Sequence, residues 1–441
     1  MRWRRRAWTA GRRLQRRPLP AAWSWPRSVP GLCCSWAPCW WPRSGTGPTL
    51  PGTGRTPRSS ARSRRSWSPR GSPLRVWCGS CRRVRPAQGR YLEAMAPPSP
   101  ASGPDVGASG QFIGVDVGGT KVAVAALEDE QLTEPTIRPT DATSADGLVE
   151  EIVAAVDAAR SERAQAVGVG VPSIVEFATG RVRSSVNLHL ANFDLRGVLE
   201  ERLGLPVFVD NDATVAAIGE AFDEGGRVLV ENLVMLTVGT GVGGGLVLGG
   251  RVYRGSTGAA GELGHTMIGA NFAEGPPVRG GFPQKGSLEA LAAGRVLDHS
   301  AADIASERPD SALGRMAAQG ERIDGRDVVR LAREGDPDAV GALRVLGERL
   351  GIGIANAINT FDPDEVVIGG GVSVAGDLLL DPARETALRF VLPGVGERTE
   401  IRLARHLGGA GFRGAAMLAA LELGRGDEAF ASPRSKVESA S

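Results

Sequence analysis

The fold is decided by the stretch Ile113-Gly114-Val115-Asp116-Val117-Gly118-Gly119-Thr120-Lys121, which the apolar residues Val122 to Leu127 follow directly. This order predicts a strand, a tight glycine turn and a returning strand. Glycines allow backbone N–H groups to close around an anion, Thr120 and Lys121 add donors, and Asp116 could hold a metal ion through water. On this stretch alone, a phosphate-binding hairpin and an ordinary Gly-Gly turn both stay open.

The composition divides the chain into two unlike parts. Residues 1–94 hold all nine Trp, all five Cys and 21 Arg, with no Lys and one acid, Glu93, so the remainder carries a net charge of about −17. From Met95 onward there is no cysteine for a disulfide framework and no apolar run long enough to span a membrane. We therefore expect a soluble, cytoplasmic protein of two or three domains with no membrane or nucleic-acid partner.

Residues 1–110 have three interpretations. The segment is rich in Arg, Trp and Pro and lacks an apolar period, so it is not expected to bury a core. It could be a basic arm for nucleic acid, a targeting sequence that begins with Arg4-Arg5-Arg6, or upstream DNA translated from a start codon placed too early. We favour the last interpretation, with Met95 as the start, because the composition changes abruptly at that methionine; otherwise we expect disorder.

The opening pattern occurs a second time. Leu233 to Leu248 is again a strand, a glycine-rich turn with hydroxyls and a returning strand. Two such hairpins indicate two similar lobes that face each other, with the phosphates of a nucleotide between the turns. The expected boundaries are 111–232 for the N-terminal lobe, joined by a C-terminal helix at 410–424, 233–409 for the C-terminal lobe, and 425–441 for a flexible tail.

Five motifs occur in the order found in one protein family. They are Asp116-x-Gly118-Gly119-Thr120-Lys121, Asn211-Asp212-Ala213, Gly239-Thr240-Gly241-x-Gly243-Gly244-Gly245, Gly261-Glu262-Leu263-Gly264-His265 and Gly369-Gly370-Gly371. Together they cover about residues 111–423, and this ordered set resembles the glucokinase-like sugar kinases of the ROK family. The resemblance implies an α/β, two-lobed actin-like (ribonuclease H-like) ATPase fold. It also implies ATP-dependent phosphorylation of a hexose, first of all glucose at its 6-hydroxyl.

The resemblance gives Asp212 the role of general base. A sugar hydroxyl is a poor nucleophile, so phosphoryl transfer needs a carboxylate beside it while glycine turns and a metal ion hold the γ-phosphate in line. Asp212 follows a short strand, Val207 to Val209, and a carboxylate at a strand end suits that task. The alternative is that Asp212 caps the helix that follows.

The resemblance also assigns the two substrates. Carboxylates, amides and imidazole bind sugar hydroxyls by accepting or sharing their protons, and the implied ligands are Asn187, Asn211, Glu262, His265 and Glu289. ATP and Mg²⁺, the metal held by Asp116 through water, are expected at the two turns and at the last glycine motif, that is at Asp116, Gly118, Gly119, Thr120, Lys121, Thr237, Gly239, Thr240, Gly241, Gly370 and Gly371.

One segment departs from the family pattern. ROK kinases usually carry three zinc-binding cysteines after the Gly-His pair, and Val278, Phe282 and Ser287 stand at these positions here. One imidazole without thiolates does not make a structural zinc site. We therefore expect no zinc, with Val278 and Phe282 packed together in its place. Because the metal would fix the tautomer and direction of His265, sugar affinity or selectivity should differ from that of glucokinases.

Two other functions stay open. One is a kinase for another hexose or an N-acetylhexosamine. The other is a ROK-type sugar-responsive regulator, or a sugar-binding protein with little kinase activity. Family repressors carry a helix-turn-helix domain before the kinase-like part, and residues 1–110 show no apolar pattern of three helices, which argues against a repressor. The resemblance further implies a homodimer, whereas the sugar and the stringency for the phosphate donor are not fixed by these motifs.

Overall fold

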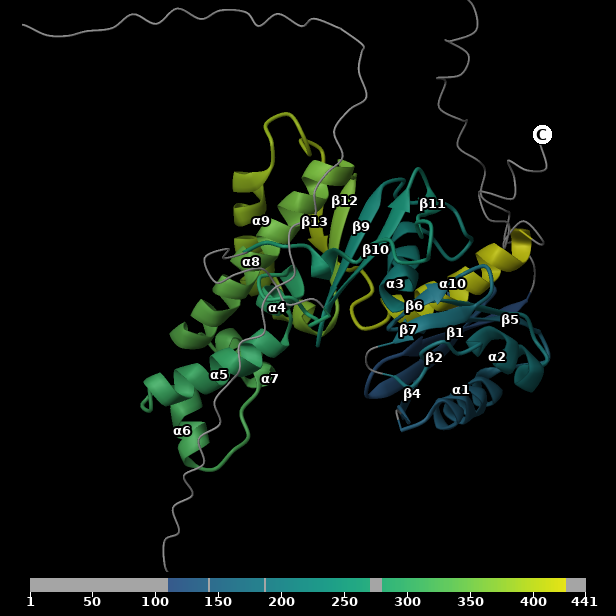
Figure 1. Ribbon diagram of the computed structural model, residues 1–441, viewed down its shortest axis with the longest axis horizontal. Helices are drawn as coiled ribbons and strands as arrows, with labels where there is room; N and C mark the ends of the chain where they lie inside the picture. Colours follow the sequence, from purple (N-terminus) through teal and green to yellow (C-terminus); the bar gives the residue numbers. More distant parts are fainter. Residues whose placement is uncertain (1–109, 142, 186–187, 270–279, 426–441) are drawn as a thin grey trace, which may run out of the picture. The chain divides into compact units, whose positions relative to one another are not determined.

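The computed structural model describes the chain from Gly110 to Arg425, except for residue 142, residues 186–187 and residues 270–279 (Figure 1). All of the described residues belong to one unit of the chain, Ala87–Ser441. The expectations for residues 1–109, Asn187, Val278 and residues 426–441 lie outside the described part.

The first sheet is built around the opening hairpin. Its strand order is β3-β2-β1-β5-β8, with β4 beside β2; β1 runs antiparallel to β2 and parallel to β5, which is parallel to β8. The carboxyl ends of β1, β5 and β8 therefore lie at one edge. The bounds are β1 Gln111–Val117, β2 Lys121–Glu128, β3 Gln131–Leu132, β4 Thr136–Pro139, β5 Ala164–Val171 and β8 Val207–Asn211.

The second sheet repeats this plan. Its order is β11-β10-β9-β12-β13, where β9 is antiparallel to β10 and parallel to β12, and β12 is parallel to β13. The repeat predicted from the two hairpins is therefore present in the topology. The bounds are β9 Leu233–Val238, β10 Val242–Leu248, β11 Arg251–Val252, β12 Glu365–Gly369 and β13 Glu400–Leu403, and a separate hairpin joins β6 Ser173–Glu176 to β7 Arg181–Ser185.

Two helices share one core with both sheets. Helix α3 (Asp212–Ala221) and helix α10 (Ala410–Arg425) pack with Phe112 and Phe208 of the first sheet and with Leu233 and Met235 of the second. Figure 1 shows them between the sheets. Because side chains of a strand alternate, Ile113, Val115 and Val234 on the same strands point to the opposite faces.

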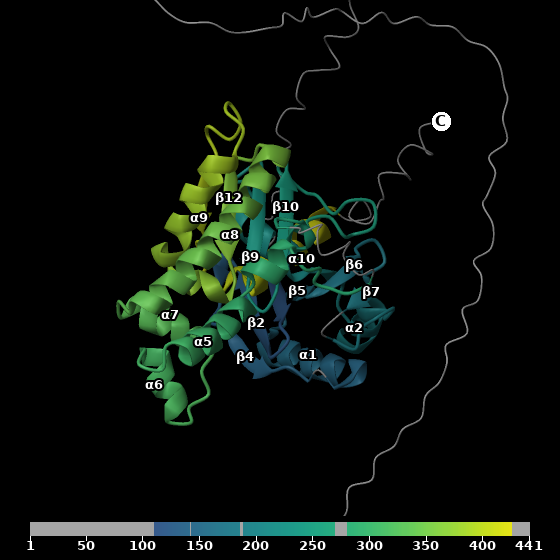
Figure 2. The same ribbon diagram turned by 60° about the vertical axis from the view of Figure 1, so that its left-hand side comes forward.

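The outer faces are covered by other helices. Helices α1 (Ala145–Ala159) and α2 (Leu195–Leu203) pack on the first sheet on the face away from α10, as Figure 2 shows. The second sheet carries the remaining helices, of which α8 and α9 pack along each other. Their bounds are α4 Leu288–Ala292, α5 Arg295–Glu307, α6 Ala312–Ala318, α7 Gly325–Arg333, α8 Pro337–Phe361 and α9 Asp377–Phe390, with short 3-10 helices η1 Leu263–His265 and η3 Gly371–Ala375.

Helix α10 lies unusually close to the first sheet. A Cβ atom on Gly114 of β1 would lie 1.9 Å from the carbonyl oxygen of Phe412, and one on Gly168 of β5 would lie 1.8 Å from that of Ala415. These are backbone atoms of a packed helix, so only glycine allows this approach. The two glycines therefore set how deeply the start of α10 reaches toward the edge where β1 ends.

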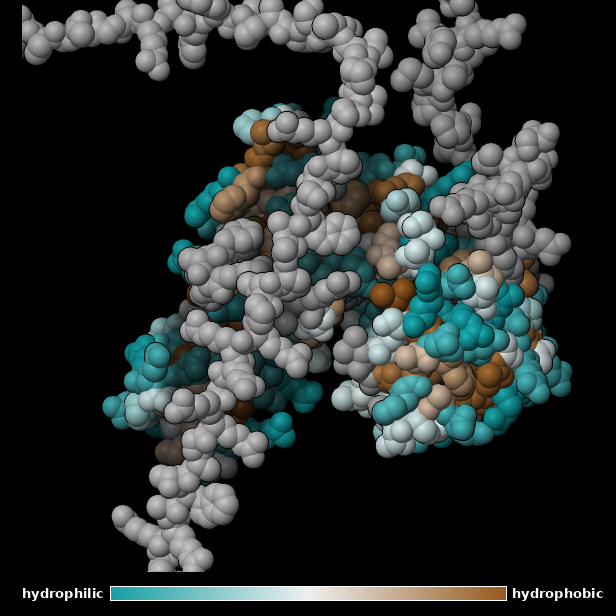
Figure 3. Space-filling model, in the orientation of Figure 1, coloured by the Kyte–Doolittle hydropathy of each residue, from teal (hydrophilic) through white to brown (hydrophobic). Residues whose placement is uncertain are grey.

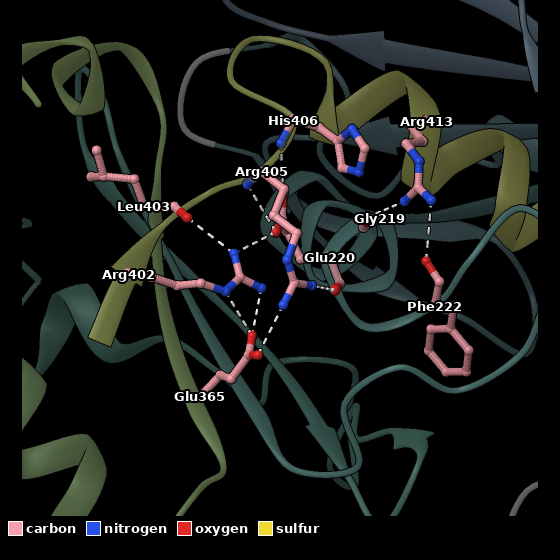
Figure 4. Close-up of polar contacts among 9 residues, drawn as sticks. All are labelled: Gly219, Glu220, Phe222, Glu365, Arg402, Leu403, Arg405, His406 and Arg413. Carbon is pink, nitrogen blue, oxygen red and sulfur yellow. Dashed lines mark hydrogen bonds and ion pairs between the residues drawn. The ribbon is translucent and has the colours of Figure 1, made fainter. Parts of the chain in front are cut away.

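A buried ion network joins α3 to the segment that returns from β13 to α10 (Figure 4). Glu220 of α3 accepts hydrogen bonds from the Arg402 side chain (2.7 Å) and from the backbone N–H groups of Arg405 (3.1 Å) and His406 (3.0 Å). Arg402 and Arg405 also bind Glu365 of β12. Removing one partner of such a buried pair costs about 3–5 kcal/mol. The network thus holds the second sheet against the shared core.

The surface carries some exposed apolar side chains. Three of them lie at the end of α9 and just after it, namely Leu388, Phe390 and Leu392, and brown surface lies over this end of α9 in Figure 3.

In the part of the chain that the structure describes, no helix combines the length and the apolar character that a bilayer crossing requires.

Candidate active site

Two carboxylates meet at the edge where β1 and β8 end. Asp116 is the last residue but one of β1, and Asp212 is the first residue of α3, directly after β8. Burial and the charge of Asp212 raise the pKa of Asp116 to about 7, while the charge of Lys121 opposes the shift. Burial also raises the pKa of Asp212, and the charge of Glu262 adds to this shift. The edge therefore collects negative charge, with Lys121 acting against it.

The cap of α3 is Asn211, not Asp212. Asn211 Oδ1 accepts hydrogen bonds from the backbone N–H groups of Ala213 (3.0 Å) and Thr214 (3.1 Å). The Asp212 carboxylate, which belongs to the first residue inside the helix, accepts a hydrogen bond from the Ala213 N–H at 2.8 Å. The capping interpretation of Asp212 is therefore wrong. The amide nitrogen of Asn211 donates to the Ser173 carbonyl oxygen (3.4 Å), so part of the group expected to bind sugar already holds the chain in place.

The first glycine turn is fixed by backbone hydrogen bonds and is exposed at its tip. The Gly118 N–H donates to the Lys121 carbonyl oxygen (2.8 Å), and Thr140 donates to the carbonyl oxygens of Gly118 (2.8 Å, from its hydroxyl) and Thr120 (3.1 Å, from its N–H). Gly119, Thr120 and Lys121 are exposed. Lys121 is linked to the rest of the site by its charge, which acts on Asp116.

The second glycine turn is surrounded by other candidate residues. The Gly239 N–H donates to the Gly241 carbonyl oxygen (2.9 Å), and its own carbonyl accepts from Gly294 (2.7 Å). Gly370, with φ of 86°, packs on the backbone of Val238: a Cβ atom there would lie 2.5 Å from the Val238 carbonyl oxygen. The last glycine motif is thus directly behind the turn, although a Cβ atom on Gly371 would meet no described atom within 4 Å.

The tips of both turns have room beside them. A Cβ atom on Gly119 or Gly239 would meet no described atom within 4 Å, and neither residue has a positive φ. Within the described chain, neither packing nor backbone conformation therefore requires glycine at these two positions. Close approach of a ligand to the backbone is a further reason for a glycine.

The second hairpin lies against the start of α3. A Cβ atom on Gly243 would lie 2.6 Å from Thr237 Oγ1 and 3.1 Å from the Ala213 side chain, and one on Gly245 would lie 2.3 Å from the Ala213 carbonyl oxygen. The glycines of β10 thus allow the first turn of α3 to approach the hairpin. This contact brings Asp212 beside the second sheet, although Asp212 directly follows a strand of the first sheet.

Glu262, His265 and Glu289 form a chain of neighbours. Glu262 Oε2 lies 3.7 Å from His265 Nε2, and burial together with the charge of Glu289 raises the pKa of Glu262, against the effect of His265. Glu289 binds the residue directly after the second turn: Oε2 accepts from the Val242 N–H (2.9 Å), and Oε1 accepts from Arg295 (2.9 Å). The expected sugar ligands therefore connect Asp212 to the second glycine turn.

The residues that stand at the family's cysteine positions make other contacts. Ser287 is buried and caps α4, where its hydroxyl accepts from the Ala290 N–H at 3.2 Å. Phe282 is 66% exposed, and its ring meets that of His265 edge to face with the centroids 5.4 Å apart. Phe282 is therefore not part of a buried apolar cluster, contrary to expectation, and Val278 lies outside the described residues.

The donor set fits a metal held mainly by water and substrate. Among the described residues, no group of three or more His, Cys, Asp and Glu side chains is arranged to hold an ion. Asp116 supplies a carboxylate in a region to which Asp212 adds negative charge. Mg²⁺ prefers oxygen ligands and usually keeps several waters beside one or two carboxylates, which suits Asp116.

Sequence reasoning missed several residues that shape the site. Arg295 holds Glu289, and a Cβ atom on Gly411 of α10 would lie 2.3 Å from Asp116 Oδ2. Neither has a local pattern that could have indicated it. Ser287 does, because a serine directly before an apolar helix is a start signal. Asn187 could not be placed, since it lies outside the described residues.

Comparisons with known proteins agree with one another. The model of the ROK family matches residues 112–422. A glucokinase of Streptomyces coelicolor is 36% identical over 317 residues, 70% of this chain and 98% of that protein. A xylose repressor of Caldicellulosiruptor bescii is 34% identical over 220 residues, 50% of this chain and 53% of the repressor.

A solved structure is similar throughout the same region. The ROK family glucokinase of Streptomyces griseus, solved in complex with glucose and AMPPNP, matches with a TM-score of 0.61 and 34% identity, over 70% of this chain and 99% of that one. This likeness confirms the predicted α/β, two-lobed actin-like fold.

Proposed function

The chain belongs to the ROK family, and we propose that it transfers the γ-phosphoryl group of ATP to a hydroxyl of a hexose, with the 6-hydroxyl of glucose as the first candidate. One observation carries this proposal. The half-buried Asp212 carboxylate lies at a sheet edge beside Asp116, and the charge of Glu262 contributes to its raised pKa. Glu262 leads through Glu289 to the second glycine turn. Groups suited to a sugar and groups suited to phosphate thus converge on one carboxylate.

In the proposed reaction Asp212 acts as general base. The sugar oxygen attacks the γ-phosphorus and forms the new O–P bond, the bond from phosphorus to the β–γ bridging oxygen breaks, and the hydroxyl proton passes to the Asp212 carboxylate. Burial raises the pKa of Asp212, which makes it a better proton acceptor than an exposed aspartate. Asn211, by capping α3, fixes the backbone from which Asp212 projects.

The two turns would hold the phosphates. The turns Gly118 to Thr120 and Gly239 to Gly241 have the glycine content that such a cradle needs. Because the N–H groups of Gly118 and Gly239 already donate within the turns, the N–H groups of the residues after them would bind the phosphates. Mg²⁺ when bound would offset the charge of the phosphates, with Asp116 as its protein ligand through water. Lys121 and Thr120 supply further donors.

On the sugar side we propose Asn187, Asn211, Glu262, His265 and Glu289 as ligands. His265 has no metal to direct it in this proposal; Glu262 and the Phe282 ring are its described neighbours. This is the reason to expect a sugar selectivity different from that of a glucokinase whose histidine binds zinc. A kinase for another hexose or an N-acetylhexosamine is therefore the nearest alternative.

A sugar-responsive regulator with little activity is the alternative from another class. The match to the xylose repressor covers only half of this chain.

We further propose that residues 111–232 with the helix at 410–424 make one lobe and residues 233–409 the other, which the packing of α10 on β1 and β5 supports. A homodimer stays a prediction from the resemblance, and a cytoplasmic location stays a prediction from the composition after Met95.

The test is turnover by the full chain against a panel of hexoses and N-acetylhexosamines with ATP and Mg²⁺. The variants Asp212→Asn and, as a matched control, Asp336→Asn, which changes an N-cap on α8, are assayed beside it. We expect Asp212→Asn to lose at least about a hundredfold in kcat and the control to lose nothing. Absence of turnover for every sugar contradicts the kinase proposal, and full activity of Asp212→Asn contradicts the assignment of the base.

A further inference from the structure

The loop that leads from β11 to Glu262 is anchored at several points. The Arg254 carbonyl oxygen accepts a hydrogen bond from the Ala260 N–H (3.2 Å), which closes the loop on itself. A Cβ atom on Gly258, where φ is 80°, would lie 1.9 Å from the Val175 carbonyl oxygen. Because that atom is backbone, the loop lies directly on β6. Glu262 and His265 follow at the end of this loop.

The Arg254 side chain connects this loop to the first sheet and to α10. Its Nε donates to Asp210 Oδ2 (2.7 Å), its Nη2 donates to Glu422 Oε1 (3.3 Å), and the guanidinium lies 3.6 Å from the centroid of the Phe177 ring. The side chains of Arg254, Asp210 and Glu422 are 17%, 3% and 2% exposed. Arg254 is thus a largely buried cation between two buried carboxylates.

Asp210 is in turn bound to the segment that carries the proposed base. It is the residue before Asn211 on β8, and while Oδ2 binds Arg254, Oδ1 accepts a hydrogen bond from the Asn211 N–H (2.9 Å). Asn211 then caps the helix that begins with Asp212. A continuous series of contacts therefore runs from the loop of Glu262, through Arg254 and Asp210, to the backbone at Asp212.

We propose that Arg254 is a positioning residue, which fixes the loop that ends at Glu262 against the strand end that carries Asp212. The inference rests on the proposed function, in which both carboxylates must reach one sugar molecule. A displacement of about 1 Å between such groups can cost about a hundredfold in rate. The planar fork of arginine binds in one orientation and covers an aromatic ring, which a lysine ammonium does not reproduce.

The kinetic test compares Arg254→Lys with Arg413→Lys in the full chain. Arg413 is also a buried arginine paired with a carboxylate, Glu224, and it binds the carbonyl oxygen of Phe222 at the C-terminal end of α3, the end away from Asp212. We expect both variants to lose thermal stability. Only Arg254→Lys should lose about tenfold or more in kcat/KM for the sugar, with KM for ATP within about twofold of the parent.

Hydrogen exchange provides a readout that does not depend on turnover. In Arg254→Lys the amides of residues 255–265 and of residues 211–214 should exchange faster than in the parent, whereas Arg413→Lys should leave them unchanged. Unchanged exchange at these amides, or a loss of stability with parental kcat/KM, overturns the proposal. If the parent phosphorylates no sugar, the proposed function fails while the exchange comparison still decides the role of Arg254.

A second variant covers a failure to fold. Removing one charge of a buried ion network is costly, whereas the triple variant Arg254→Gln, Asp210→Asn and Glu422→Gln replaces the cation and both carboxylates by neutral groups that can still form hydrogen bonds. We expect the triple variant to fold and to show the same loss in kcat/KM and the same faster exchange. Parental values of both in the folded triple variant also overturn the proposal.

Discussion

Burial and the neighbouring carboxylate of Asp212 raise the pKa of Asp116 to about 7. Asp116 lies near the end of β1 and Asp212 directly follows β8, and the two meet because both strands run parallel to β5, which lies between them. Their shared edge is therefore electrostatically strained when both are ionised. A cation at this edge relieves the repulsion, which links metal binding, pH and stability in one pair of residues.

The first prediction concerns stability against pH without ATP or Mg²⁺. The folded pKa of Asp116 lies above its unfolded value of 3.8, so its contribution to stability is full below pH 3.8 and is lost as the pH rises to about 7. Asp116→Asn cannot ionise. The melting temperature of Asp116→Asn relative to that of the parent should therefore rise with pH across this interval, whereas that of the exposed control Asp303→Asn should not. A difference between Asp116→Asn and the parent that stays constant with pH contradicts this prediction. Mg²⁺ with ATP should stabilise the parent more than the variant.

The second prediction concerns the acid limb of kcat/KM. Asp212 must be ionised to accept a proton, and burial and Glu262 raise its pKa, so activity should fall at a higher pH than an ordinary aspartate would cause. Glu262→Gln removes one source of the shift. Its limb should move to lower pH, in addition to any loss of rate. Profiles for the parent, Glu262→Gln and the exposed control Glu201→Gln would check this, and an unmoved limb would count against the coupling.

The third prediction concerns Gly411. A Cβ atom here would lie 2.3 Å from Asp116 Oδ2, and because the obstacle is the end of a side chain, Asp116 should move rather than the helix. Gly411→Ala should therefore fold with a melting temperature near the parent but lose about tenfold or more in kcat/KM for ATP. The control is Gly341→Ala on α8, where a Cβ atom would meet no described atom within 4 Å. Its free energy of unfolding should rise by about 0.5–1 kcal/mol, and its activity should be that of the parent. Parental kinetics of Gly411→Ala would argue against a role for Asp116.

The fourth prediction concerns Ser287. Loss of its cap on α4 should cost about 1 kcal/mol in the free energy of unfolding. Because α4 is only five residues long and carries Glu289, we also expect a rise in KM for the sugar. Ser311→Ala removes the equivalent cap from α6 and is the matched control. Denaturant melts and sugar kinetics would separate the two effects, and equal kinetics for both variants would show that the cap acts on stability alone.

The fifth prediction concerns zinc. We expect the purified full chain to hold no zinc in a fixed ratio, because His265 has no thiolates at the family positions. Metal analysis of the parent and of His265→Asn would check this. One tightly held zinc per chain that disappears in the variant would contradict the prediction. Zinc that is present in both would instead belong to a site that does not include His265.

The fold followed from features that are local in the chain. A strand, a glycine turn and a returning strand occupy consecutive residues, so alternation and turn chemistry could be read directly from Ile113 to Leu127 and from Leu233 to Leu248. The ordered motifs then indicated Asp116, Asp212 and Glu262, which the structure brings to one place. Backbone hydrogen bonding and glycine conformation depend on neighbours in sequence, and this is why these inferences were possible.

What only the tertiary structure decided were contacts between distant segments. Whether Asn211 or Asp212 caps α3 depends on side-chain orientation, and either residue type can cap a helix. The partners of Arg254, Arg295 and Gly411 lie far from them in the chain or on another element. Such pairs are selected by packing and by the cost of burying a charge without a partner, which no local pattern records. The sequence determined which lobes and turns form, and the packing of α3, α10 and the loop of Glu262 decided how the site is held.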